Sequence, residues 1–297
     1  MIFLSKENGI IDTHEHYQKG GNISLFFSIM KDLGISKVLF VPTGSSPKNR
    51  GHKVNTIELL KLQEKFPEKI IAFCTIYEKD PGAFEFFKKC IKKGAKGLKL
   101  IGGHPHYYKP GLLANRNLYK VLELAKIFQL PILVHVSPIR LPQAEKEFKI
   151  ILKKYPEITF IWAHFCSCIY QDIYLKKCQY YLNKYSNLYT DISMGGGIKR
   201  YFKHLETING AKIIRDFIIK YQDRILWGSD IILSSKKSQT RAWLRERIGT
   251  DFKIHRERFF KSKFAQNPDS LINGLFLPKR VLRKIYIENP KKILRLK

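Results

Sequence analysis

The sequence predicts an α/β fold, a (β/α)₈ TIM barrel with a basic insertion between the eighth strand and the C-terminal helix. Short runs rich in Ile, Val, Leu and Phe alternate with longer amphipathic stretches, which is typical of βα units. Eight such runs occur, and eight is the number of strands in a TIM barrel. A doubly wound open sheet can also hold eight strands, but no Gly-rich phosphate-binding turn follows the first run.

Most of the eight runs are nearly continuous in apolar character, as parallel strands are when helices cover both faces of their sheet. We therefore assign one barrel strand to each run, in chain order. The expected strands are Ile10–His14, Lys37–Pro42, Ile70–Ile76, Gly97–Ile101, Ile132–Val136, Thr159–His164, Leu188–Ile192 and Ile225–Asp230.

Helices are expected between the strands because apolar residues recur there at three- and four-residue spacing. Gly34, Pro67 and Gly94 stand where three of these helices should end. The expected helices are Leu25–Leu33, Thr56–Lys65, Ala83–Lys92, Leu118–Phe128, Gln143–Lys154, Ile213–Tyr221 and, as the last, Lys279–Glu288.

The chain of 297 residues is long enough for a single barrel domain over residues 1–297, and its hydrophobic fraction of 44% suits a globular fold. No stretch approaches the roughly 18 consecutive apolar residues that a membrane helix needs. The N-terminus lacks the basic region, long apolar core and cleavage site of a signal peptide. We expect a cytoplasmic protein that has no membrane partner.

The five cysteines are scattered along a long chain, and their odd number argues against a disulfide framework and for a reducing compartment. Cys166 and Cys168 form a lone C-x-C pair. Because no second cysteine pair completes a metal site, we expect ordinary thiols at these two positions, with metal ligation as the alternative.

The charge balance is unusual, since 54 Lys and Arg stand against 25 Asp and Glu and give a formal net charge of +29. A field of this sign attracts nucleic acid, anionic membrane surfaces or acidic small molecules. A compositional bias is the alternative explanation, because the charge is spread over most of the chain. The predicted insertion, residues 233–277, is itself basic, and insertions after barrel strands emerge on the face that holds barrel active sites.

Side chains suited to metal binding fall at the ends of several expected strands. His14 and His16 close the first strand, and residues two apart in a strand point to one side. His135 closes the fifth strand, His164 the sixth and Asp230 the eighth. Taken alone, each of these residues has a structural explanation. A buried His is more often a core residue, and an Asp after Gly-Ser more often belongs to a turn or caps a helix. Because strand ends converge at one barrel mouth, the five together predict a divalent-metal site suited to zinc.

Six motifs follow one another along nearly the whole chain. They are Ile11-Asp12-Thr13-His14-Glu15-His16, Gly97-Leu98-Lys99-Leu100, Pro131-Ile132-Leu133-Val134-His135, Trp162-Ala163-His164, Leu226-Trp227-Gly228-Ser229-Asp230 and Ile287-Glu288-Asn289-Pro290-Lys291-Lys292-Ile293-Leu294. In this order they resemble the motifs of the metal-dependent hydrolases of the amidohydrolase superfamily, in the amidohydrolase-related branch that includes decarboxylases and lactonases.

The resemblance implies that His14, His16 and His135 bind the metal. It makes Asp230 a further ligand or the general base, and His164 a second-metal ligand or a catalytic imidazole. The cofactor is then a divalent ion, zinc by preference, with one ion expected and two as the alternative. A bound metal lowers the pKa of its water to about 7, and Asp230 lies where it could accept the proton.

Three further residues are expected to contact substrate. Lys99 lies on the fourth strand, where binuclear members of the superfamily carry a carboxylated Lys or a Glu that bridges two metals. We expect a non-bridging role for Lys99, as a substrate-carboxylate anchor or in a structural ion pair. His104 and His106 form a second His-x-His motif on the loop that should overhang the site, with an exposed loop as the alternative. Residues 195–197, three glycines, either admit substrate to the backbone or form a flexible loop.

The expected activity is hydrolysis of a small, anionic amide, lactone or ester by metal-activated water. Decarboxylation of a small carboxylic acid is the alternative, because the ligand set is shared and fold does not choose between them. A TatD-type deoxyribonuclease would suit the charge, but Lys99 stands where that family has a metal-binding Glu, so nucleic acid is not the expected partner. A basic barrel that only binds a partner is the non-enzymatic alternative. Many relatives are oligomers, so a homo-oligomer is an option.

Overall fold

The computed structural model describes residues 9–44, 51–167, 172–194, 197–236 and 238–296. The predictions on Cys168, Gly195 and Gly196 lie outside these described residues. Within the described ranges, no helix combines the length and the apolar character that crossing a membrane requires.

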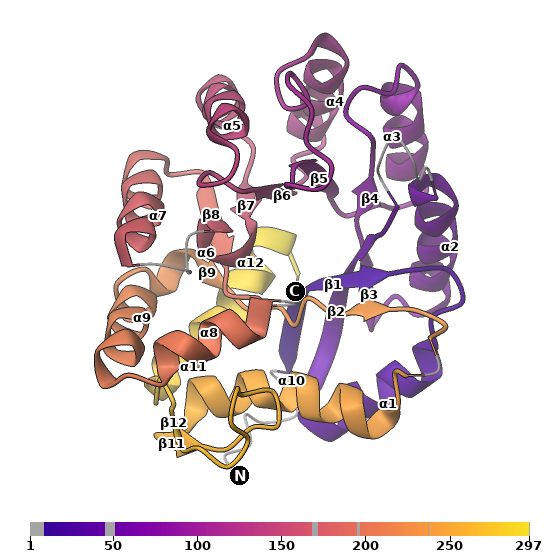
Figure 1. Cartoon of the computed structure of the whole chain (residues 1–297). Coiled ribbons are helices and arrows are strands. Elements are labelled where there is room, and N and C mark those ends of the chain that lie inside the picture. The colour runs from indigo at the N-terminus through magenta and orange to yellow at the C-terminus, as the bar shows by residue number, and fades with distance from the viewer. Residues whose placement is uncertain (1–8, 45–50, 168–171, 195–196, 237, 297) are drawn as a thin grey trace.

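Parallel strands form the centre of the molecule, and helices surround them (Figure 1). One sheet has the order β10-β1-β2-β3 and the other the order β4-β5-β6-β7-β8-β9. A short antiparallel hairpin, β11-β12, lies apart from both. The strands are β1 Ile10–Tyr17, β2 Ile35–Pro42, β3 Ile70–Ala72, β4 Cys74–Thr75, β5 Leu98–Gly103, β6 Ile132–Val136, β7 Phe160–Trp162, β8 Leu188–Asp191, β9 Ile225–Leu226, β10 Ile232–Leu233, β11 Phe259–Phe260 and β12 Ile272–Asn273.

The two parallel sheets join at both sides and form the barrel. β3 and β4 are parts of one expected strand, separated by Phe73, whose amide donates to the Phe40 carbonyl of β2 at 3.0 Å. β9 pairs with β8, and β10 pairs with β1. Between β9 and β10, the Trp227 carbonyl accepts from the Thr13 amide of β1 at 3.0 Å. Each of the eight predicted strands is found. The third is divided into β3 and β4, the eighth is limited to β9, and β10 lies beyond its predicted end at Asp230.

The helices follow the strands, and side chains at their starts explain several boundaries. Asn22, Asn115 and Thr207 each accept a hydrogen bond from an amide in the first turn of the helix that follows. Gly34, at a left-handed φ of 73°, ends α1 as predicted. The helices are α1 Ile23–Leu33, α2 His52–Lys65, α3 Ala83–Lys92, α4 Arg116–Ile127, α5 Pro142–Lys154, α6 Ala163–Ser167, α7 Asp172–Lys184, α8 Ile198–Leu205, α9 Ile208–Lys220, η3 Gln222–Arg224, α10 Arg241–Arg256, α11 Lys279–Arg283, η4 Lys284–Glu288 and α12 Asn289–Leu294.

The elements additional to the predicted set are α6, α7, α8, η3, α10 and α12. The buried residues described on α7 are Leu175, Cys178, Tyr181 and Leu182, so two of the four positions are held by cysteine and tyrosine rather than by aliphatic residues. Such residues weaken an aliphatic periodicity, so the helix pattern is faint in the sequence.

Helix α10 lies within the predicted basic insertion and packs beside α1 (Figure 1). Its Arg241 and Arg245 pair with Asp32 of α1, at 2.7 and 3.9 Å. Its Arg247 pairs with Asp251 in the interior at 2.8 Å. These basic side chains contribute to helix packing at the flank of the barrel.

Two apolar clusters support the barrel. The larger one includes most of the buried helix residues. The smaller one takes alternate residues from the strands, such as Leu39 and Val41 of β2, as expected for side chains that point into a barrel. Ile293 and Leu294 of α12 also belong to it. Toward the C-terminal ends of the strands, the apolar filling gives way to polar side chains.

Cys166 and Cys178 are joined by a disulfide, with 5.5 Å between their Cα atoms. The expectation of an ordinary thiol at Cys166 is therefore wrong. The two cysteines lie 12 residues apart, and the turn between β7 and α7 brings them together. Intracellular disulfides are rare, so this pair also weakens the argument for a reducing compartment.

Candidate active site

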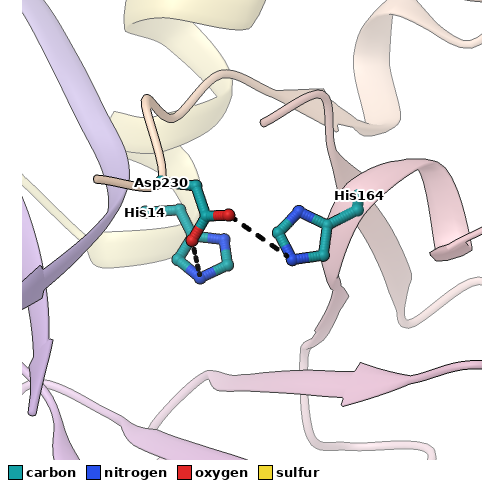
Figure 2. Close-up of side chains that lie close together, drawn as sticks. All are labelled: His14, His164 and Asp230. Atoms are coloured by element: carbon teal, nitrogen blue, oxygen red, sulfur yellow. Dashed lines mark ion pairs between the residues drawn. The ribbon is translucent and has the colours of Figure 1, made fainter. Parts of the chain in front are cut away.

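Three histidines converge on the carboxylate of Asp230. Its Oδ1 lies 3.1 Å from Nε2 of His16 and 3.5 Å from Nε2 of His14. Its Oδ2 lies 3.8 Å from Nε2 of His164, so the carboxylate stands between the His14 and His164 rings (Figure 2). The His14 side chain is fully buried and the others are largely so. Four residues predicted from strand ends are thus brought together.

Asp191 and Ser193, at the end of β8, orient two of these rings. Asp191 Oδ2 accepts from His14 Nδ1 at 3.0 Å. The Ser193 hydroxyl donates to Asp191 and accepts from His164 Nδ1 at 2.9 Å. Because Nδ1 of each ring is then the donor, Nε2 of each carries a lone pair and faces Asp230. Metal-binding histidines are commonly held by such partners.

The turn that carries Asp230 is fixed to β1 by a buried carboxylate. Asp12 accepts from the amides of His14 and Ser229 at 3.2 and 3.1 Å, and from the Ser229 hydroxyl at 2.6 Å. A Cβ on Gly228 would lie 2.5 Å from Cβ of His14, so the close approach requires glycine. Asp230 follows with a left-handed φ of 52°, and its amide donates to the His14 carbonyl at 2.7 Å. The Gly-Ser-Asp sequence therefore places Asp230 beside His14.

His164 was predicted to be the last residue of the sixth strand. It lies instead in a left-handed turn just after β7, which ends at Trp162. Residues 164–167 have φ between 51° and 61°. This conformation costs about 1–2 kcal/mol per non-glycine residue. Two amides of the turn are held by β8, since His164 donates to Asp191 Oδ1 and Cys166 donates to Thr190 Oγ1, each at 3.0 Å. Strained backbone of this kind clusters at functional sites.

The other predicted histidines form a row that leads away from His164. The ring centroid of His135 lies 4.9 Å from that of His164 and 4.4 Å from that of His104. The His106 ring follows, 5.1 Å from His104. His135 is therefore one ring removed from Asp230, and His104 and His106 lie further out along the same row.

Lys99 of β5 is buried and points at the cluster from within the barrel. Its Nζ lies 3.2 Å from Nε2 of His14. The ammonium therefore donates to the same lone pair that faces Asp230. A metal ion taken up by His14 would have to displace this hydrogen bond.

The charge states follow from burial and from near neighbours. Burial, assisted by the Lys99 ammonium, lowers the pKa of His14 to about 4, so the ring is neutral at pH 7. Burial lowers the pKa of Lys99 to about 8. Burial alone would raise the pKa of Asp230, but the positive charge of His164 and His14 when they are protonated, together with a hydrogen bond from His16, holds it well below its ordinary value. His14 likewise keeps the pKa of buried Asp191 below its ordinary value. Both carboxylates are therefore ionised.

The donor set fits a divalent metal ion. The ligand atoms of His14, His164 and Asp230 all lie within 4.8 Å of one another. Two neutral imidazoles with lone pairs and one carboxylate are ligands that zinc and similar ions accept. The predicted ligands His16 and His135 lie outside this compact group, although His16 contacts Asp230 directly.

A cavity of about 260 Å³ opens beside His164. None of the described residues that line it belongs to the predicted insertion 233–277. The positive charge in its wall comes instead from two arginines on other elements. Its wall includes His104, His106, His135, His164, Arg140 and Arg200.

Sequence reasoning missed several residues of the site. Asp191 is the last residue of β8, so the strand-end rule that selected Asp230 would also have found it. Ser193 follows two positions later. Arg140 and Arg200 carry no comparable signal, because they lie beyond the strands in a chain where basic residues are everywhere abundant.

The chain matches a known protein family over most of its length. Residues 58–296 match the family model described as Amidohydrolase. The chain belongs to the amidohydrolase family. The resemblance drawn from the motifs is confirmed, and the protein is an enzyme of a metal-dependent hydrolase family. The match includes Lys99, His135, His164 and Asp230, but begins after β1 and its two histidines.

Solved structures with the same barrel cover nearly the whole of this amidohydrolase. A probable 2-pyrone-4,6-dicarboxylic acid hydrolase from Acinetobacter baumannii, with citric acid bound, has a TM-score of 0.62 and 15% identity over 97% of this chain and 99% of its own. A 2,6-dihydroxybenzoate decarboxylase from Rhizobium has a TM-score of 0.61 and 12% identity over 97% and 99%.

A 4-oxalomesaconate hydratase from Rhodopseudomonas palustris has a TM-score of 0.57 and 15% identity over 97% of this chain and 96% of its own. At these identities the likeness establishes the fold alone. A comparison with curated protein sequences gave no significant match.

Proposed function

We propose that this amidohydrolase hydrolyses a small anionic amide, lactone or ester at a metal site held by His14, His164 and Asp230. The observation that carries the proposal is the position of the Asp230 carboxylate between two imidazole lone pairs. The carboxylate and both lone pairs can bind a cation, and the Lys99 ammonium already contacts the lone pair of His14. A divalent ion would be held by all three groups at once. His16, whose Nε2 lies 3.1 Å from Asp230, is proposed as a further ligand, as is His135 after a shift of its ring.

A divalent ion bound there would polarise a substrate oxygen and acidify a water molecule. Asp230 is ionised and is proposed to take the proton from that water and to pass it to the leaving group. Asp191 and Ser193 hold His14 and His164 with their Nε2 atoms toward the reacting centre. Lys99, whose ammonium contacts His14 Nε2, is proposed to bind a substrate oxyanion.

Zinc is the proposed metal and one ion the proposed number, because imidazole and carboxylate ligands suit zinc. Decarboxylation of a small carboxylic acid is the second candidate, and the structural likeness to a decarboxylase favours keeping it. Cytoplasmic location and homo-oligomer formation stay predictions.

The test begins with metal analysis of the purified full chain by mass spectrometry. We expect about one zinc or similar ion per chain, lost in His14→Asn. Ester, lactone and amide hydrolysis should be abolished by a chelator, restored by zinc, and lowered about 100-fold or more in Asp230→Asn. His204→Asn, a histidine of α8 away from the site, is the matched control. Full metal content in His14→Asn would overturn the proposal, and carbon dioxide release without hydrolysis would favour the second candidate.

A further inference from the structure

The cavity beside His164 has two arginines in its wall that come from different elements. Arg140 lies on the loop between β6 and α5, and Arg200 lies in the first turn of α8. Both side chains are exposed to solvent. A guanidinium stays protonated at any physiological pH, so both charges are permanent.

None of the described residues that line this cavity is an aspartate or a glutamate. Asp230, the carboxylate of the proposed metal site, is not part of the described lining, and its Oδ2 lies 3.8 Å from Nε2 of His164, which is. Two cations in one wall repel each other, and the field inside the cavity favours an anion. The charge distribution therefore separates a carboxylate-bearing metal end from an arginine end.

The dimensions suit a small molecule. The cavity of about 260 Å³ is just below the range of about 300–1,000 Å³ that is usual for drug-sized ligands. The planar guanidinium fork matches a carboxylate, with which it forms two parallel hydrogen bonds. The Ser137 and Ser167 hydroxyls in the same wall add neutral hydrogen-bonding groups.

We infer that Arg140 and Arg200 bind a carboxylate of the substrate that is remote from the reacting group, and that they select small diacids over monoacids. The inference rests on the proposed function, because His164 and the metal end must hold the other part of the substrate. Arg140 and Arg200 are then specificity residues. The basic segment 233–277 has no part in this selection, since none of its described residues lines the cavity.

The experiment compares two rigid probes by isothermal titration calorimetry on the zinc-reconstituted full chain. Isophthalate carries two carboxylates and benzoate carries one. We expect the wild type to bind isophthalate more tightly. Arg140→Gln and Arg200→Gln should each weaken isophthalate by about tenfold or more, the effect of losing a hydrogen bond to a charged group, and should leave benzoate nearly unchanged.

Lys199→Gln is the matched control, because Lys199 is the exposed neighbour of Arg200 on α8 and does not line the cavity. It removes the same charge without removing a cavity contact. The inference is overturned if the wild type shows no preference for isophthalate, if both arginine variants bind it as the wild type does, or if Lys199→Gln weakens it equally.

Failure of the proposed metal site gives a different result. In that case His14→Asn would keep the full metal content and bind benzoate as the wild type does. Loss of isophthalate binding in the arginine variants would still support the anion subsite. If instead His14→Asn loses its metal while the arginine variants bind isophthalate normally, the metal site is supported and the subsite is wrong.

Discussion

Nδ1 of His14 lies 3.0 Å from Oδ2 of Asp191, and neither side chain is exposed. The contact joins β1 to β8, two strands that are not neighbours in either sheet. The same carboxylate accepts from the amide of His164 and from the Ser193 hydroxyl. One buried aspartate therefore aligns His14 and His164, two of the proposed metal ligands, and is not itself proposed as a ligand.

Asp191→Asn should weaken metal binding while leaving the ligands in place. An amide nitrogen beside His14 Nδ1 would donate to it and favour the tautomer that has its hydrogen on Nε2, where no lone pair is left for a cation. We expect zinc affinity, measured by competition with a chelator, to fall about 10–100-fold. Asp216→Asn, an exposed change on α9, should have no effect. Unchanged zinc affinity in a folded Asp191→Asn protein would contradict the proposed role.

Lys99→Met should leave one metal ion per chain. The uncarboxylated Lys99 side chain is hydrogen-bonded to His14 Nε2 through its ammonium group, and we propose that it does not bridge two ions. Removing the amine frees the Nε2 lone pair, so zinc affinity should be unchanged or higher, while turnover falls if Lys99 binds substrate. Metal counting and turnover on the same preparation check this. Two ions per chain in the wild type, reduced to one in Lys99→Met, would show that a modified Lys99 bridges two metals.

The sequence predicted the barrel well because its signals are local. Apolar runs and amphipathic periodicity can be recognised in a single sequence, and each of the eight expected strands is found. Strand breaks were not predictable, since the division at Phe73 and the turn from Trp227 to Asp230 depend on contacts with other strands. The pattern of α7 is weak for a different reason, because Cys178 and Tyr181 take two of its four described buried positions.

The candidate site was predictable only for residues whose type and position at a strand end both suggest metal binding. His14, His16, His164 and Asp230 meet as strand-end logic predicts. Asp191, at the end of β8, satisfies the same strand-end rule and was overlooked. Ser193 was not predictable, because a serine near a strand end is common for many reasons. The cavity arginines lie on a loop and a helix, and only the folded chain shows that they share a wall with His164.

Glu78→Gln should change how stability depends on pH. Glu78 is fully buried, and Oε1 accepts from the amides of Ile101 and Gly102, while Oε2 has no partner among the described residues. Burial raises the pKa of Glu78 to about 7 from its ordinary 4.5. The folded state thus prefers the protonated acid, whose contribution is complete below pH 4.5 and is lost as pH rises toward 7.

A glutamine at position 78 is neutral at every pH and keeps the accepting oxygen. The free energy of unfolding of Glu78→Gln, relative to wild type, should therefore increase between pH 5 and pH 8. Each pKa unit corresponds to about 1.4 kcal/mol, so a gain of a few kcal/mol is the upper bound. Urea titrations at the two pH values check this, with the exposed Glu206→Gln as control. A difference that does not change with pH would show that Glu78 is ionised in the folded protein.

Reduction of the Cys166–Cys178 disulfide should lower stability. The bond closes a segment with a sequence separation of 12, for which the chain-entropy model gives about 3 kcal/mol. It also fastens the left-handed turn of His164 to α7, so the turn loses one of its supports when the bond opens. We expect dithiothreitol to lower the melting temperature of the wild type by several degrees. Cys178→Ser should melt at the lower temperature from the outset and should not respond to the reductant. An equal response of both proteins would assign the effect to other cysteines, and no response of either would show that the bond does not stabilise the fold.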